Sequence, residues 1–214
     1  VAHSVAATNT VQICPARVVG LVSDAEVIHV NIQQGDAAST LTAKLLVGAD
    51  GGQSSIRQLL NIPQHITEYG QTALVTTIKS SLPHKNTAFE RFTASGPLAL
   101  LPIANNQCSV VWTRTTDDAK ALMQSSDADF LAGYKLGRLT LTAPRRSFPL
   151  SLIRAEKMRA NRAVIIGNAV HQLHPVAGQG FNLGLRDVVQ LAEMISTRHQ
   201  AGRDIGAEDF LTDY

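Results

Sequence analysis

The chain has 214 residues, of which 44% are hydrophobic and 17% are charged, and its formal net charge is +2. This length is sufficient for one or two hydrophobic cores. Acidic and basic residues are interspersed along the chain without a basic stripe, so we exclude nucleic acid as a partner. Apolar runs such as residues 98–103 are too short to span a bilayer, and no signal peptide is visible. The sequence therefore predicts a cytoplasmic globular protein.

Only two cysteines occur, Cys14 and Cys108. Their spacing is not typical of a metal site, and two cysteines do not make a disulfide framework, so we expect two buried, reduced thiols. The chain begins without Met just upstream of a predicted strand and stops inside a predicted helix. We therefore expect it to be a fragment of a longer protein.

The first third of the chain predicts strands, because it is rich in Val, Ile, Thr and Leu between clusters of turn residues. These strands are expected over residues 10–22, 25–34 and 40–50. A short helix follows over residues 54–62, with Ser54 or Ser55 as its N-cap and Pro63 preventing its extension.

The middle of the chain predicts an antiparallel meander, because short strand candidates are separated by connections that contain Pro, Asn or Gly. Its strands are expected over residues 71–81, 87–93, 97–104 and 107–114. Residues 117–137 predict one or two helices. Residues 138–153 predict an extended segment at a sheet edge, because Pro144 and Pro149 interrupt it.

Near residue 160 the pattern changes again. Residues 162–167 form a short apolar run with β-branched residues, which is typical of a strand buried on both faces of a parallel sheet. The following helix carries an apolar stripe of Phe181, Leu185, Val188, Ala192 and Ile195. The fold class is therefore α/β (mixed α+β), in which residues 1–65 and 160–214 form parts of one domain and residues 66–159 form an inserted β-sheet domain.

The stretch GNAVHQLHPVAGQGFNLGLRD (167–187) places four glycines where a strand passes into a helix. Amides at a helix N-terminus lack intrahelical partners and attract anions. Gly178 and Gly180 leave the backbone open to a flat or phosphorylated ligand, while Pro175 stiffens the turn. The alternative is a glycine-rich helix entry that serves packing alone.

A second stretch, LLVGADGGQSSIR (45–57), has the same order of strand, turn and helix. It places Asp50, followed by Gly51 and Gly52, at the carboxyl end of a strand, where open α/β sheets bind ligands. An Asp-Gly turn with a helix cap would give the same local pattern.

The segments GADGGQSSIR (48–57) and 167–187 resemble the Asp-Gly and Gly-Asp motifs of class A FAD-dependent aromatic hydroxylases. Together with ERFTASGPLALLPI (90–103), they resemble the ubiquinone-biosynthesis branch. The resemblance implies a partial FAD-binding Rossmann-like domain with an inserted β-rich substrate domain. It also implies an FAD- and NAD(P)H-dependent monooxygenase that uses O2, through an FAD C4a-hydroperoxide, to hydroxylate the ring of a polyprenylated phenol. The Gly-x-Gly-x-x-Gly element of such enzymes is not in this sequence.

The resemblance also assigns roles to individual residues. Pro175 would line the oxygen-reactive face of the flavin as the catalytic residue. The residues implied in FAD binding are Asp50, Gly51, Gly167, Asn168, Gly178, Gln179, Gly180, Phe181 and Asn182. Asn168 stands where the family has Asp, so it keeps an acceptor oxygen but loses the charge. Arg57 would support its turn electrostatically.

Other residues have simpler interpretations. No third ligand accompanies His171 and His174, so we expect no metal site; His171 would be structural and His174 would line the flavin pocket. Phe89 and Phe92 are expected in the core, or as a roof over an aromatic ring. Two alternatives are left open: hydroxylation of a small soluble phenol, and a non-catalytic flavin-fold scaffold. A peripheral position at the inner membrane, or in a ubiquinone-biosynthesis assembly, is compatible with the polyprenyl tail of the implied substrate.

Overall fold

The computed structural model describes residues 10–132, 137–174 and 179–214, which divide into two compact units. Unit 1 comprises residues 1–65, 153–172 and 178–214, and unit 2 comprises residues 66–152 and 173–177. The predicted boundaries lie at 65/66 and 159/160, whereas the chain returns to unit 1 at Ile153. It returns earlier because Ile153 and Arg154 pair with a strand of that unit.

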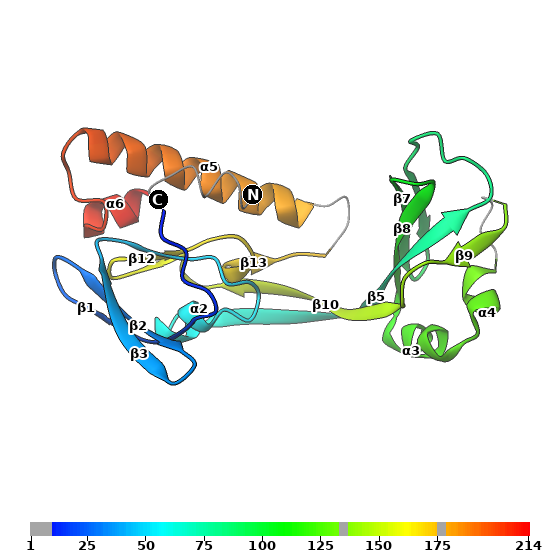
Figure 1. The fold of residues 1–214 in the computed structure, drawn as a ribbon, viewed down its shortest axis with the longest axis horizontal. Helices are drawn as coiled ribbons and strands as arrows, with labels where there is room; N and C mark the ends of the chain where they lie inside the picture. The colour runs from blue at the N-terminus through cyan, green and yellow to red at the C-terminus, as the bar shows by residue number, and fades with distance from the viewer. Residues whose placement is uncertain (1–9, 133–136, 175–178) are drawn as a thin grey trace. The chain divides into compact units, whose positions relative to one another are not determined.

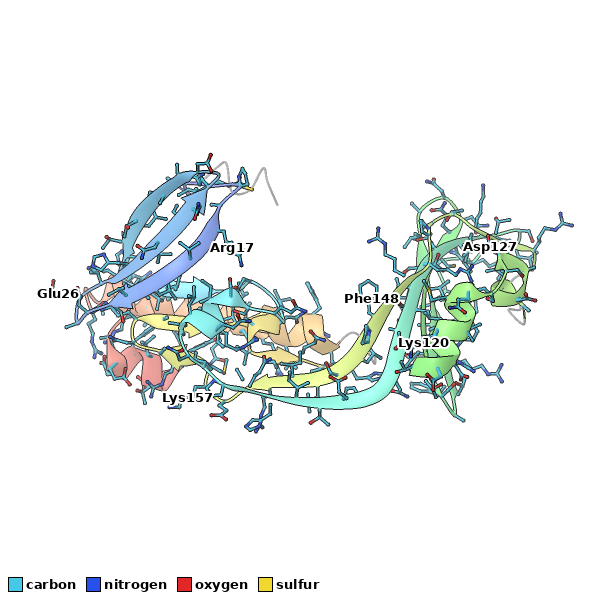
Figure 2. The ribbon with its side chains drawn as sticks, turned by 90° about the horizontal axis from the view of Figure 1, so that it is seen from below. Arg17, Glu26, Lys120, Asp127, Phe148 and Lys157 are labelled. Atoms are coloured by element: carbon cyan, nitrogen blue, oxygen red, sulfur yellow. The ribbon has the colours of Figure 1, made fainter. Side chains whose placement is uncertain are left out.

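Unit 1 contains an antiparallel sheet of three strands in the order β1-β2-β3. The strands are β1 (Arg17–Ser23), β2 (Ile28–Gln34) and β3 (Ala37–Ala43). Asp24 shapes the first turn by accepting hydrogen bonds from the N–H groups of Glu26 and Val27. In Figure 2, Glu26 lies at this turn and Arg17 at the start of β1.

The second sheet of unit 1 contains the parallel pair β4 (Leu46–Gly48) and β12 (Ala163–Ile165), with β11 (Arg159–Ala160) antiparallel to β12. The prediction of one strand over 40–50 is therefore wrong. The chain leaves the first sheet after Ala43, and Arg162 fixes the break: its guanidinium donates to the carbonyl of Lys44. Its backbone carbonyl accepts from the N–H of Leu46.

Strand β12 is buried on both faces, as predicted, because successive side chains point to opposite sides of a sheet. Val164 packs against Leu191 of α5 (Gln179–Gln200) and against α6 (Glu208–Asp213). Ile165 packs on the other side against Ile56 of α2 (Ser55–Leu59). Figure 1 shows α5 running along one side of β12, with α2 on the other.

Helix α5 buries only the C-terminal end of the predicted apolar stripe. Phe181 is 77% exposed, and Leu185 and Val188 are exposed as well. Leu191, which is not in the stripe, is the buried residue of the helix, and Ile195 of the stripe packs beside it with Met194. The partly buried side of the helix also carries polar residues that bond within unit 1: Asp187 accepts from Gly167, and Arg198 donates to Asp209.

Unit 2 contains the predicted antiparallel meander, in the strand order β5-β8-β7-β6. Its strands are β5 (Gln64–Ser80, which begins in unit 1), β6 (Phe89–Thr93), β7 (Gly96–Ile103), β8 (Gln107–Thr115) and β9 (Leu139–Leu141). The predicted helices are α3 (Thr116–Gln124) and α4 (Asp127–Leu131), and Figure 2 labels Lys120 on α3 and Asp127 on α4. Phe130 and Leu74 form the core between these helices and the sheet.

Three expectations outside the site need correction or refinement. Phe89 and Phe92 are not core residues: both are exposed, Phe92 by 68%. Cys108 is buried but Cys14 is exposed, since it precedes the first strand. Strand β10 (Arg146–Ala155) lies between β5 and β13 (His171–Gln172) in strand order, but β13 pairs only with Ile153 and Arg154. On the β13 side, the part of β10 that contains Pro149 therefore has no paired strand among those described, which agrees with the predicted edge position. No described helix is long and apolar enough to cross a membrane.

Candidate cofactor site

Two loops of unit 1 leave the same edge of the parallel sheet. Gly48 of β4 is paired with Ile165 of β12, so the residues after each strand emerge side by side. We call them the Asp50 loop (residues 49–53) and the Gly167 turn (Gly167–Ala169). Carboxyl ends of parallel strands are where open α/β sheets bind ligands. The two motifs found in the sequence therefore meet in one place.

Asp50 is held by the first turn of α2. Its carboxylate accepts hydrogen bonds from the hydroxyls of Ser54 and Ser55 and, at 3.0 Å, from the N–H of Ile56. Burial raises the pKa of Asp50, but these hydrogen bonds outweigh it and bring the pKa below its ordinary value. Asp50 is therefore ionised at neutral pH. The helix cap weighed as an alternative is present, and contact of Asp50 with FAD stays a prediction.

Ser54, one of the two predicted candidates, is the N-cap of α2, and its hydroxyl accepts from the N–H of Arg57 at 2.9 Å. Gly51 and Gly52, which precede it, differ in the space around them. Gly51 has φ +86°, which favours glycine, and a Cβ there would meet nothing within 4 Å. Gly52 instead lies against Gln172 of β13, and a Cβ there would require the amide end of the Gln172 side chain to shift. The backbone of Gly51 is thus free for close approach by a ligand.

Arg57 joins the two loops. Its guanidinium donates to the carbonyl of Ala169 at 2.9 Å and to the carbonyl of Gly52 at 3.2 Å, and Arg57 is only 2% exposed. The interpretation of Arg57 as a support for its own turn is therefore too narrow, because one side chain holds both motifs together.

Asp187 of α5 holds the Gly167 turn. Its carboxylate accepts a hydrogen bond from the N–H of Gly167 at 2.8 Å, and its side chain is 14% exposed. Gly167 has φ +59°, and a Cβ built on Gly184 would lie 3.4 Å from its Cα, so the helix passes close to the turn. Sequence reasoning gave Asp187 no role. Its position three residues after Gly184, on the same side of the helix, is the signal that could have identified it.

His171 faces the same carboxylate without bonding to it. Its Nε2 lies 3.8 Å from Asp187 Oδ2 and has no hydrogen-bond partner among the described residues. The structural role predicted for His171 stays a prediction. No group of three or more His, Cys, Asp or Glu side chains in the described part of the chain is arranged to hold a metal ion.

The remaining predicted cofactor residues lie at exposed positions. Asn168 is exposed in the Gly167 turn, and Gln179, Phe181 and Asn182 are exposed in the first turn of α5. A Cβ on Gly180 would meet nothing within 4 Å, so neither packing nor backbone conformation requires a glycine there. Pro175 and Gly178 lie outside the described residues.

These residues fit FAD. Gly51 and Gly180 leave backbone open without a packing reason, and Asn168 offers an exposed amide in the Gly167 turn. Gly180 lowers the helix propensity of α5, and no packing contact requires a glycine there. Close approach of a ligand to the backbone would explain why this position has no side chain.

Comparison with known proteins supports the same cofactor. A family model described as "FAD binding domain" matches residues 3–205. Ubiquinone hydroxylase UbiL of Rhodospirillum rubrum is 37% identical over 208 residues, covering 94% of this chain and 48% of that protein. The mitochondrial ubiquinone biosynthesis monooxygenase COQ6 of mouse is 32% identical over 227 residues, covering 87% and 47%. The chain thus spans about half the length of these curated relatives.

A solved structure gives the same fold. PqsL, described as a probable FAD-dependent monooxygenase from Pseudomonas aeruginosa, has a TM-score of 0.75 at 24% identity, covering 93% of this chain and 57% of that protein. The resemblance to the ubiquinone-biosynthesis branch of flavin hydroxylases is confirmed by the curated relatives. With a family model that matches nearly its whole length, the chain belongs to the FAD binding domain family.

Proposed function

We propose that the whole protein is an FAD- and NAD(P)H-dependent monooxygenase that hydroxylates the aromatic ring of a polyprenylated phenol in ubiquinone biosynthesis. Membership of the FAD binding domain family and similarity to UbiL and COQ6 support this proposal. The structural observation that carries it is the joining of the Asp50 loop and the Gly167 turn by Arg57 at one edge of the parallel sheet.

In this proposal, FAD supplies the redox chemistry that activates O2. Gly51 and Gly180 admit the cofactor to the backbone, and Asn168 binds one of its hydroxyls. The N–H groups in the first turn of α5 lack intrahelical partners, so they favour negative charge on the cofactor. Asp50, which is ionised, fixes its loop through α2 and influences the approach of the nicotinamide. Pro175 lines the reactive face.

Purification of the full-length protein tests this function. We expect a flavin absorption spectrum, oxidation of NADH or NADPH that a phenol stimulates, and one atom of 18O from 18O2 in the product. A prenylated phenol should stimulate turnover more than an unprenylated one such as salicylate, and the reverse preference would favour the small-phenol alternative. Bound flavin without turnover on any phenol would favour the scaffold, and a colourless protein would contradict the proposal.

The polyprenyl tail of the proposed substrate also leads us to propose a peripheral position at the inner membrane. Flotation of the full-length protein with vesicles of inner-membrane lipid tests it. We expect to recover the protein in the lipid fraction, and to recover less of it there when the vesicles are omitted. Recovery only in the dense fraction would contradict it.

A further inference from the structure

His174 carries a buried hydrogen-bond acceptor that no donor in the described part of the chain satisfies. Its Nδ1 atom is screened from solvent and has no partner among the described residues. A polar atom that has lost water and gained no partner is costly, and such atoms are uncommon in folded proteins. His174 belongs to unit 2, which contains the β-rich sheet.

The neighbouring hydrogen bonds determine which nitrogen of His174 carries the proton. The side-chain NH2 of Gln71 donates to the carbonyl of Ser95 at 3.1 Å, which turns the amide oxygen of Gln71 toward His174. That oxygen lies 3.0 Å from Nε2 of His174 and can only accept, so Nε2 must be the N–H donor. In the neutral ring, Nδ1 is then a lone-pair acceptor.

The imidazole is also held in place and kept neutral. The ring of Tyr69 meets it edge to face, with centroids 5.3 Å apart and planes at 74°. Burial lowers the pKa of His174, which favours the uncharged ring at neutral pH. Gln71, Ser95 and Tyr69 all belong to unit 2, so the support of this acceptor comes from the β-rich unit and not from the loops that we assign to FAD.

We propose that Nδ1 of His174 accepts a hydrogen bond from the phenolic hydroxyl of the aromatic substrate and so selects phenols over their ethers. This inference rests on the proposed function, because it takes the substrate to be a phenol. Because Nδ1 is screened from solvent in this structure, the protein atoms that cover it have to move before the substrate hydroxyl can reach it. A site built to bond a hydroxyl discriminates strongly against an analogue that lacks one, because the buried acceptor is then left unpaired.

Two substitutions of His174 separate its two nitrogens. His174→Gln keeps an N–H near the Nε2 position, facing Gln71, and removes the acceptor at Nδ1. His174→Asn keeps an amide oxygen near the Nδ1 position and loses the contact with Gln71. Calorimetric titration of the full-length protein, with and without FAD, would measure binding of 2-geranylphenol and of its methyl ether.

We expect the wild-type protein to bind the phenol at least about tenfold more tightly than the ether. In His174→Gln this preference should fall below about twofold, through weaker binding of the phenol and not tighter binding of the ether. His174→Asn should recover most of it. Flavin content and melting temperature, measured alongside, show that the variants are folded.

A preference that survives in His174→Gln would overturn the proposal, as would a wild-type protein without preference. Loss of FAD from His174→Gln together with an unchanged preference would assign Nδ1 to the flavin N–H and also overturn it. Failure of the proposed function gives a different result. If the wild-type protein does not oxidise NAD(P)H but prefers the phenol, and His174→Gln abolishes this preference, the activity is refuted and the inferred binding site is supported.

Discussion

The guanidinium of Arg57 donates a hydrogen bond to the carbonyl of Ala169, 112 residues away along the chain. A second bond from the same group reaches the carbonyl of Gly52. Both bonds are shielded from solvent, where hydrogen bonds to a charged group are stronger than in water. Arg57 therefore makes the Asp50 loop and the Gly167 turn parts of one structure, and stability of unit 1 and cofactor binding should depend on it together.

Replacing Arg57 by Met should lower the free energy of unfolding by about 2–3 kcal/mol, because two carbonyls lose a charged donor. Arg57→Lys should have an intermediate effect, since an ammonium group cannot reproduce the planar fork that bonds both carbonyls. Urea denaturation of the flavin-free protein measures this change. The matched control is Arg17→Met, because Arg17 is exposed. A loss below about 0.5 kcal/mol for Arg57→Met would show that the two bonds contribute little.

Asp187 should matter for FAD through the turn that it holds. Asp187→Leu removes the acceptor for the N–H of Gly167, so we expect FAD affinity to fall by roughly tenfold to a hundredfold. Asp187→Asn keeps an acceptor oxygen and should lose less than about threefold. Quenching of flavin fluorescence gives both affinities, with the exposed Glu193→Gln on the same helix as the control. Equal losses in the two Asp187 variants would refute the specific role of the acceptor.

The sequence predicted those parts of the fold that local pattern determines. Strand β12 and the cap of α2 were found because an apolar run and a Ser N-cap act over a few residues. The break between β3 and β4 was missed because no turn residue marks it. It depends on Arg162, which bonds the carbonyl of Lys44 from 118 residues away.

The same limit explains the errors at the site. The stripe predicted for α5 followed apolar side chains alone, whereas the side of the helix that faces unit 1 combines Leu191 with partly buried polar residues that have partners. Asp187 bonds Gly167, and Arg198 donates to Asp209 and lies over the ring of Phe210. These partners belong to elements outside the helix, so the periodicity of α5 alone could not identify them.

Replacing Gly180 or Gly51 by Ala should change the stability of the protein in opposite directions but should weaken FAD binding in both cases. Gly180→Ala adds a side chain in open space within a helix, so it should raise the stability of the flavin-free protein by roughly 0.5–1 kcal/mol. Gly51→Ala should lower stability by about 1 kcal/mol, because φ is +86°. Both methyl groups should weaken FAD binding by roughly tenfold, about 1.4 kcal/mol. Thermal melting and flavin titration give the two quantities, and unchanged FAD affinity in Gly180→Ala would place the cofactor elsewhere.

Asp204 should make unit 1 sensitive to acid. The hydrogen bond from Arg162 lowers the pKa of Asp204 to about 2, against the opposing effect of burial and with help from the N–H of Gly206. A carboxyl whose pKa is lower in the folded than in the unfolded chain stabilises the fold above its unfolded value, near 3.8, and loses that contribution as pH falls toward 2. The difference in unfolding free energy between wild type and Asp204→Asn should therefore be largest at pH 5 and shrink by pH 2. Urea denaturation at several pH values measures it, with the exposed Asp36→Asn as the control. A difference that does not change with pH would mean that the charge of Asp204 does not stabilise the fold.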